Sequence, residues 1–292
     1  MGMLDGKVAL VTGAGGGLGR AHALLLAKEG ASVVVNDLGG ARDGSGAGHN
    51  MADQVVNEIK AAGGKAIADY GSVADPAQAK AMVQAAVKHF GKIDICINNA
   101  GILRDKSFKN MTDDMWDIII SVHLRGTYLV TKAAYDQMIE QGHGGRIIMT
   151  SSTSGLLGNF GQTNYGAAKA ATAGFMRCLW LEGVKYGITV NILAPTAMSR
   201  LTEDILPEQM KDAFPPEKVS PAVVWLCTDD AKDVSGRQFL IAGNNVQLLS
   251  WQLTPIASKD QKDAPWTVKS IGEKILASKE NWPPINPMRG MG

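Results

Sequence analysis

Residues 7–19 read KVALVTGAGGGLG, and this stretch decides the fold that we predict for the chain. Its first half is an apolar run that predicts a buried strand, and a helical pattern follows the glycines. Glycines between a strand and a helix let the backbone approach a pyrophosphate, which the helix N-terminus attracts. The spacing is Gly13-x-x-x-Gly17-x-Gly19 rather than GxGxxG. An ordinary tight turn is the alternative, but the position favours a dinucleotide site that includes Gly13, Gly17, Leu18 and Gly19.

The second predicted strand, 32–36, is followed directly by Asp37. A carboxylate at this place can accept hydrogen bonds from the ribose hydroxyls of an adenosine, and it would repel a 2′-phosphate. The nearest arginine, Arg42, lies five residues further along the chain. Asp37 therefore predicts NAD rather than NADP, although an aspartate can also simply begin a turn. We interpret the Gly-rich stretch 38–50 as a surface loop near the adenosine end.

Length and charge limit the class of protein. A chain of 292 residues suits one large α/β domain, or a domain with an extension. The 29 basic and 28 acidic residues nearly cancel, so no field is evident that would recruit nucleic acid or a membrane surface. The N-terminus has neither the basic nor the apolar segment of a signal peptide, and no apolar run is long enough to span a membrane.

The cysteines indicate the compartment. Cys96, Cys178 and Cys227 are widely spaced and form no CxxC pair. This pattern argues against a disulfide framework or a zinc site and for a reducing environment. We therefore expect a soluble cytoplasmic protein that needs no metal ion.

A second motif lies in residues 151–169, after another apolar run that predicts a strand. Tyr165 and Lys169 are four residues apart, so on a helix they share one face. An ammonium beside a phenol favours the phenolate, and we expect Lys169 to lower the pKa of Tyr165. Ser152 at the end of the strand could hold a substrate oxygen while Tyr165 accepts its proton. Because a YxxxK pair also arises by chance, the motif gains its weight from the glycine-rich turn.

Together the two motifs resemble the short-chain dehydrogenase/reductase family, whose active site is a Ser, a Tyr and a Lys at this spacing. The resemblance implies catalytic roles for Ser152, Tyr165 and Lys169. It also implies an α/β fold, a Rossmann-type doubly wound parallel sheet of about seven strands. We expect this domain to occupy 1–253, followed by a C-terminal extension at 254–292. A homodimer or homotetramer is expected by analogy.

The resemblance adds cofactor contacts from loops that follow other strands. The residues that it places against NAD, besides the glycine turn and Asp37, are Ser72, Val73, Asn99, Ala100, Gly101, Tyr165, Lys169, Pro195 and Thr196. Ser72 stands where many members have Asp, and Thr196 follows Pro195 where relatives usually have Gly. His123 falls where most members have an Asn that completes a catalytic tetrad. A packed histidine and a proton relay are both open for this residue.

Longer strings narrow the resemblance to one branch of the family. They are NNAGILRDKSF at 98–108, VHLRG at 122–126, MTSSTS at 149–154 and GNFGQTNY at 158–165. They resemble the (3R)-hydroxyacyl-CoA dehydrogenase module of peroxisomal multifunctional enzyme type 2, also known as 17β-hydroxysteroid dehydrogenase type 4, and its stand-alone bacterial relatives. His123 and the long loop after Asp37 belong to that branch.

The branch implies an NAD-dependent oxidoreductase that oxidises the 3-hydroxyl of a (3R)-hydroxyacyl-CoA with a fatty-acyl or steroid side chain. Alternatives are a 17β-hydroxysteroid dehydrogenase acting on free steroids, another carbonyl reductase or sugar dehydrogenase, and a non-catalytic NAD-binding protein. The stretch 199–216 is the expected substrate lid. Arg104, Lys106 and Lys109 could meet the phosphates of coenzyme A, or could be solvated loop charges.

Overall fold

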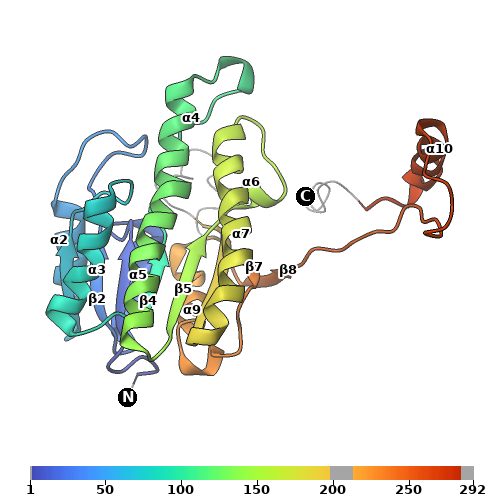
Figure 1. The fold of residues 1–292 in the computed structure, drawn as a ribbon. Coiled ribbons are helices and arrows are strands. Elements are labelled where there is room, and N and C mark those ends of the chain that lie inside the picture. The colour runs from blue at the N-terminus through green and yellow to red at the C-terminus, as the bar shows by residue number, and fades with distance from the viewer. Residues whose placement is uncertain (1, 198–212, 284–292) are drawn as a thin grey trace. The chain divides into compact units, whose positions relative to one another are not determined.

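An eight-stranded sheet organises the part of the chain that the structure, a computed structural model, describes, namely residues 2–197 and 213–283 (Figure 1). The strand order is β3-β2-β1-β4-β5-β6-β7-β8, in which β1 to β7 run parallel and β8 is antiparallel to β7. The strands are β1 Val8–Thr12, β2 Ser32–Asn36, β3 Lys65–Asp69, β4 Ile95–Asn98, β5 Gly145–Thr150, β6 Ile188–Thr196, β7 Gln238–Ala242 and β8 Asn245–Leu249.

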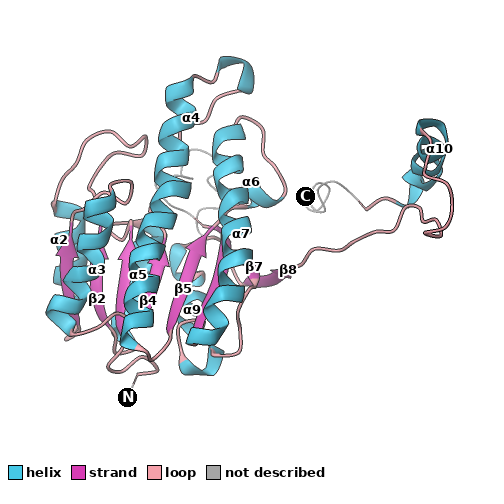
Figure 2. Ribbon diagram, viewed as in Figure 1, coloured by secondary structure: helices cyan, strands magenta, loops and turns pink. Residues whose placement is uncertain are grey.

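Helices cover both faces of this sheet, as a doubly wound fold requires (Figure 2). Helices α1, α2 and α9 pack against one face, and α3, α5 and α7 pack against the other. The α-helices are α1 Gly17–Lys28, α2 Asn50–Ala61, α3 Pro76–Phe90, α4 Asp113–Ile119, α5 Thr127–Gln141, α6 Thr153–Leu156, α7 Thr163–Gly183, α9 Ser220–Trp225 and α10 Val268–Ser278. The predicted fold class is therefore confirmed.

Local sequence explains the ends and faces of these helices. Helix α2 buries Ala52, Val55, Val56 and Ile59, which is the spacing of one helical face. Helix α3 begins after Asp75, whose side chain accepts the amide proton of residue 78 at 2.8 Å. It ends at a glycine in the left-handed region. These local features determine where the helices begin and end and which faces they bury, and none of them depends on a bound ligand.

The structure differs from the expected fold in one place and adds two local features. It has the additional edge strand β8, where we predicted about seven strands. Helices α4 and α5 are joined by a π-helical segment, Ile120–Gly126. Residues 153–156 form the short helix α6, and α7 begins at Thr163, two residues before Tyr165. The antiparallel strand follows a two-residue turn after β7, and π-helical turns have no signal in hydrophobic periodicity.

The chain divides into two compact units, 1–249 and 250–292. The first contains the whole sheet. The described part of the second contains α10, which begins with a capping box between Thr267 and Ser270. None of the helices that the structure describes is long and apolar enough to cross a membrane.

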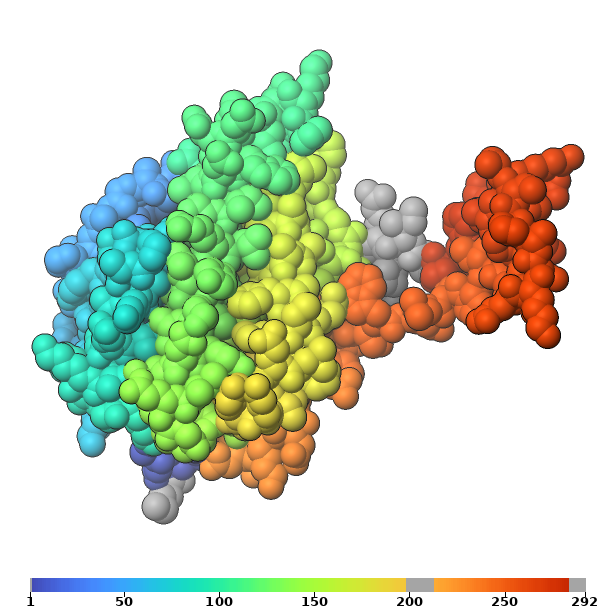
Figure 3. Space-filling view, viewed as in Figure 1, coloured from blue at the N-terminus to red at the C-terminus, as the bar shows by residue number. Residues whose placement is uncertain are grey.

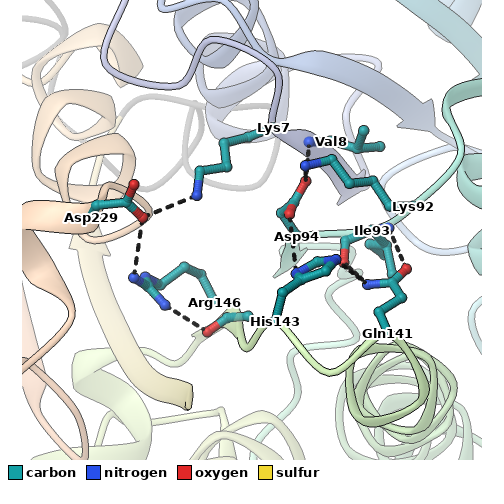
Figure 4. A network of polar contacts seen from close by, with 10 residues as sticks. Lys7, Val8, Lys92, Ile93, Asp94, Gln141, His143, Arg146 and Asp229 are labelled. Carbon is teal, nitrogen blue, oxygen red and sulfur yellow. Dashed lines mark hydrogen bonds and ion pairs between the residues drawn. The ribbon is translucent and has the colours of Figure 1, made fainter. Parts of the chain in front are cut away.

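A polar network occupies the amino-terminal end of the parallel strands (Figure 4). One carboxylate oxygen of Asp94 accepts the amide proton of Val8 at 2.7 Å and lies 3.1 Å from the Lys92 ammonium. The other oxygen lies 3.6 Å from Nδ1 of His143. The same end of the sheet carries a second set of ion pairs, formed by Lys7, Arg146 and Asp229. This network ties together the starts of β1, β4 and β5.

Candidate active site

A pocket lies at the carboxyl ends of the parallel strands, beside β1 and its two neighbours β2 and β4, where the direction in which strands are added to the sheet reverses. Ligands bind at such a switch point in open α/β sheets. Nine of the residues predicted to contact the cofactor line it: Gly13, Gly17, Leu18, Asp37, Ser72, Val73, Asn99, Ala100 and Gly101. The lining also includes Ala41, Arg42 and Gly44 from the loop 38–50, so this loop forms part of the pocket wall.

The glycine turn is held in place by the loop after β4. Gly13 has a φ of 62°, and a Cβ there would lie 2.7 Å from the Cα of Ala100. The side-chain amide of Asn99 donates to the carbonyl groups of Thr12 and Gly13, each at 3.0 Å. Gly19 does not line the pocket but lies beneath the turn, where a Cβ would come within 2.2 Å of the Gly13 oxygen. Only glycine therefore permits this close approach of backbone to backbone.

Asp37 is buried at the edge of the same pocket. One of its carboxylate oxygens accepts the amide proton of Gly15 at 2.8 Å, and the other accepts that of Gly39 at 2.7 Å. The carboxylate thus links the glycine turn to the loop 38–50. Each oxygen retains a further lone pair for a ribose hydroxyl. Ser72 has no carboxylate, and its hydroxyl instead accepts a hydrogen bond from the Ala74 amide at 3.3 Å.

The three predicted catalytic residues come together beyond β5. Ser152 precedes α6 and caps it, because its hydroxyl accepts the amide proton of Ser154 at 3.1 Å. Tyr165 and Lys169 lie on α7, one turn apart, and the Lys169 ammonium is 5.6 Å from the centre of the Tyr165 ring. The Lys169 ammonium also donates to the Thr150 carbonyl oxygen at 2.6 Å.

The pKa of Tyr165 moves in the direction opposite to our expectation. Burial raises the pKa of Tyr165 to about 12, while a hydrogen bond with Ser152 lowers it and the charge of Asp105 raises it further. Burial also lowers the pKa of Lys169 to about 7. Desolvation disfavours the charged form of both groups, so it outweighs the attraction that four-residue spacing suggests. With this pKa, Lys169 is only partly protonated at neutral pH, and the phenolate is stabilised only while Lys169 carries its proton.

His123 lies in the π-helical segment and is buried against both the pocket and Tyr165. Its Nε2 is 2.7 Å from the carbonyl oxygen of Ile102, and its ring meets the Tyr165 ring edge-on with centres 5.0 Å apart. Its Nδ1 has no hydrogen-bond partner among the residues that the structure describes. Burial and the charge of Lys169 hold the pKa of His123 well below 6.5. The imidazole is therefore neutral, and its Nε2 contacts the backbone of the pocket loop at both the carbonyl oxygen and the amide of Ile102.

Two other sets of predicted residues lie apart from this cluster. Pro195 and Thr196 are the last residues of β6, where they pair with Ile241 and Ala242 of β7, and they do not line the pocket. Most of the expected lid 199–216 lies outside the described residues. No group of three His, Cys, Asp or Glu side chains within 2–197 and 213–283 could hold a metal ion.

Our sequence reasoning missed three polar residues that contact the catalytic segment. Gln162 and Asn164 are buried immediately before Tyr165, and Asp105 accepts a hydrogen bond from the Gln162 amide at 2.7 Å. Both amide residues belong to the string GNFGQTNY, which we used only to assign the chain to a branch of the family. Two amides next to a candidate catalytic tyrosine are a usable signal, because buried amides need specific partners.

The chain is similar to known dehydrogenases over most of its length. The family model for short chain dehydrogenase matches residues 7–208. Peroxisomal multifunctional enzyme type 2 of Mus musculus is 47% identical over 281 residues, which are 96% of this chain. The chain covers only 37% of the length of that relative. A hydroxyacyl-CoA dehydrogenase of Mycobacterium tuberculosis is 40% identical over 260 residues, which cover 85% of this chain and 80% of the relative.

A solved structure is similar as well. A short chain dehydrogenase from Mycobacterium paratuberculosis bound to NAD superposes with a TM-score of 0.76 and is 26% identical. The match covers 83% of this chain and 98% of the solved chain.

Proposed function

The chain belongs to the short-chain dehydrogenase family and is an oxidoreductase, and from this premise we propose that it uses NAD to oxidise the 3-hydroxyl of a (3R)-hydroxyacyl-CoA. The observation that carries the proposal is the convergence of Ser152, Tyr165 and Lys169 beside a pocket built on the glycine turn and Asp37. The acyl-CoA substrate is supported by the hydroxyacyl-CoA dehydrogenase relative, which the chain matches over most of its length.

The pocket residues fit a dinucleotide. The backbone of Gly13, Gly16 and Gly17 lines the pocket at the start of α1, where a pyrophosphate would bind. Asp37 would accept the ribose hydroxyls and disfavour a 2′-phosphate. Lys169 would contact the nicotinamide ribose, and Ala100 and Gly101 would lie against the cofactor. Bound NAD supplies the hydride acceptor and a positive charge.

The residues of this chain supply the proton chemistry. Ser152 and Tyr165 hydrogen-bond the substrate hydroxyl, and Tyr165 takes its proton as the carbon-bound hydrogen leaves as hydride. Burial opposes ionisation of Tyr165, so nearby positive charge is needed to stabilise the phenolate. Lys169, with a pKa of about 7, can carry that charge or release a proton at neutral pH. The two residues therefore work as a coupled pair in a site that excludes water.

We also propose a homodimer. The surfaces of α5 and α7 lie side by side on one face (Figure 3). Tyr128 on α5 and Leu181 on α7 are exposed there by 47% and 63%. Exposed apolar side chains on two neighbouring helices can become buried at an interface between subunits. Sedimentation analysis of the purified protein tests the assembly. The three free cysteines support a reducing, cytoplasmic compartment, which cell fractionation tests.

The decisive experiment measures NAD reduction by the purified protein with (3R)- and (3S)-3-hydroxyacyl-CoA and with a free 17β-hydroxysteroid. Turnover of the (3R) thioester, and its loss in Tyr165→Phe, is the expected result. Reaction of the free steroid alone would contradict the thioester substrate but leave the dehydrogenase chemistry intact. Activity that survives in Tyr165→Phe would contradict the mechanism.

A further inference from the structure

We infer that residues 104–106 form a bridge that transmits occupancy of the adenosine end of the pocket to the loop before Tyr165. Arg104 and Asp105 are its positioning residues. The inference rests on the proposed function in one respect, the assignment of the pocket beside Asp37 to the adenosine half of a dinucleotide. It does not depend on the identity of the oxidised substrate.

The first half of the bridge joins 104–106 to the loop 38–50, which forms part of the pocket wall. The side chain of Arg104 donates to the carbonyl oxygen of Asp43 at 2.7 Å, and its guanidinium lies 3.8 Å from the Asp43 carboxylate. The amide of Leu103 donates to the carbonyl oxygen of Arg42 at 3.1 Å. Any movement of the loop 38–50 on ligand binding would therefore act on the backbone of Leu103 and on the side chain of Arg104.

The second half joins the same segment to the start of α7. The side-chain amide of Asn164 donates to the carbonyl oxygen of Arg104 at 3.1 Å, and its oxygen accepts the amide proton of Tyr165 at 2.7 Å. The side-chain amide of Gln162 donates to the carboxylate of Asp105 at 2.7 Å. Both amides are buried, so leaving either without its partner costs about 1–3 kcal/mol.

Gln162 extends the bridge through the rest of the catalytic loop. Its side-chain oxygen accepts hydrogen bonds from the Ser154 hydroxyl at 2.6 Å and from the Asn159 amide at 3.1 Å. The Lys106 amide donates to the Gly161 carbonyl oxygen at 2.9 Å. Residues 104–106 thus hold, directly or through Gln162, residues next to the catalytic serine and tyrosine. The same segment is hydrogen-bonded to the loop 38–50 in the pocket wall. A contiguous set of hydrogen bonds of this kind can carry a coupling free energy between two sites.

The test is hydrogen–deuterium exchange of the full-length protein with AMP, which carries only the adenosine half of the cofactor, and separately with NADH. Peptides covering 13–19 report binding, and peptides covering 158–166 report transmission. In the wild type we expect AMP to slow exchange in both regions, by roughly fivefold in 158–166, the lower end of typical coupling between sites. No alcohol substrate is present, so the result is separate from the proposed oxidation.

Three variants separate transmission from folding. Arg104→Ala and Asp105→Ala should keep the AMP protection at 13–19 and lose it at 158–166. Asp105→Asn keeps an oxygen that can accept from Gln162, so it should retain most of the protection. Asp114→Ala removes another exposed carboxylate, on α4, and should behave as the wild type. The retained protection at 13–19 shows in each case that the variant is folded and binds the ligand.

Several outcomes would overturn the bridge. AMP protection confined to 13–19 in the wild type would show that the adenosine end does not communicate with the catalytic loop. Unchanged protection at 158–166 in both alanine variants would show that communication takes another route. If neither AMP nor NADH protected 13–19, the cofactor assignment itself would fail, and the bridge with it. Failure to oxidise the thioester would leave the exchange results unaffected.

Discussion

The ionisable groups at the two ends of the parallel sheet have different surroundings. At the carboxyl end, burial has moved the pKa of Tyr165 up to about 12 and that of Lys169 down to about 7, and Nδ1 of His123 has no partner among the described residues. At the amino end, the Asp94 carboxylate is shared between a backbone amide, the Lys92 ammonium and the His143 imidazole (Figure 4). Burial at the carboxyl end therefore opposes the charged forms of Tyr165 and Lys169. The Asp94 carboxylate at the amino end instead has hydrogen-bond and ion-pair partners.

This difference indicates that the groups needed for catalysis and the groups that stabilise the fold lie at opposite ends of the sheet. A buried phenol and a buried amine are destabilising on their own, because each has lost water without a full set of replacing contacts. A carboxylate that ties β4 to β1 contributes to stability through charge-assisted hydrogen bonds. Substitutions at the carboxyl end should therefore reduce activity while sparing stability, and substitutions at the amino end should do the reverse.

The largest effect is expected for Tyr165→Phe. Loss of the proton acceptor should lower kcat/KM by about 10³–10⁴-fold, near the upper end of what one acid–base group contributes. Thermal unfolding should be nearly unchanged, because removing a buried hydroxyl offsets the loss of its hydrogen bond with Ser152. Tyr128→Phe, at an exposed tyrosine, is the matched control and should leave both measurements unaltered. A fall in activity of less than about tenfold would show that another group accepts the proton.

The reverse pattern is expected for Asp94→Ala at the amino end. The substitution leaves the amide of Val8 and the charge of Lys92 without their partner, so the free energy of unfolding should fall by about 2–4 kcal/mol. Urea unfolding measures this change. At a temperature where the variant stays folded, kcat should remain within about twofold of the wild type, because no group at the carboxyl end is altered. A large loss of kcat without loss of stability would contradict the separation of the two ends.

Lys169→Met should abolish turnover but stabilise the folded protein in a manner that depends on pH. The pKa of Lys169 is about 7 when folded and about 10.5 when unfolded, so between these values the unfolded chain binds more protons. The unfavourable contribution of Lys169 is therefore largest below pH 7 and fades as the pH rises toward 10. The variant should exceed the wild type by roughly 1–3 kcal/mol at pH 7, with the gap closing by pH 10. Unfolding curves across this range measure the gap, and a gap that widened with pH would refute the assignment.

The features that could be predicted from the sequence are those that a short stretch of the chain determines. The glycine turn could be predicted because Gly13 must adopt a conformation that few other residues tolerate, and this requirement is local. Tyr165 and Lys169 were placed on one face by helical spacing alone. The displaced pKa values were not predictable, because they depend on how deeply α7 is covered by the rest of the fold. The contact between Asp105 and Gln162 spans 57 positions, so no local pattern encodes it.

The smallest effect, and the sharpest test of how the carboxyl end is organised, concerns His123. Its Nε2 lies 2.7 Å from the carbonyl oxygen and 3.1 Å from the amide nitrogen of Ile102, which lines the pocket. His123→Asn is too short to make these contacts and should lower kcat/KM by about tenfold, mainly through KM for NAD. His123→Gln can extend an amide nitrogen toward the same carbonyl and should recover most of the loss. Steady-state kinetics with NAD as the varied substrate separate the two variants.

The pH dependence then distinguishes a neutral positioning histidine from a proton relay. Because burial and the charge of Lys169 hold the pKa of His123 well below 6.5, the ring stays uncharged from about pH 6 to pH 9. Removing it should therefore delete no titration step, and the shape of the kcat/KM profile in that range should persist in both variants. Disappearance of an acidic limb near pH 6 in His123→Gln would instead mean that the ring titrates during turnover. The unpartnered Nδ1 would then be the atom that exchanges the proton, since Nε2 contacts the backbone of Ile102.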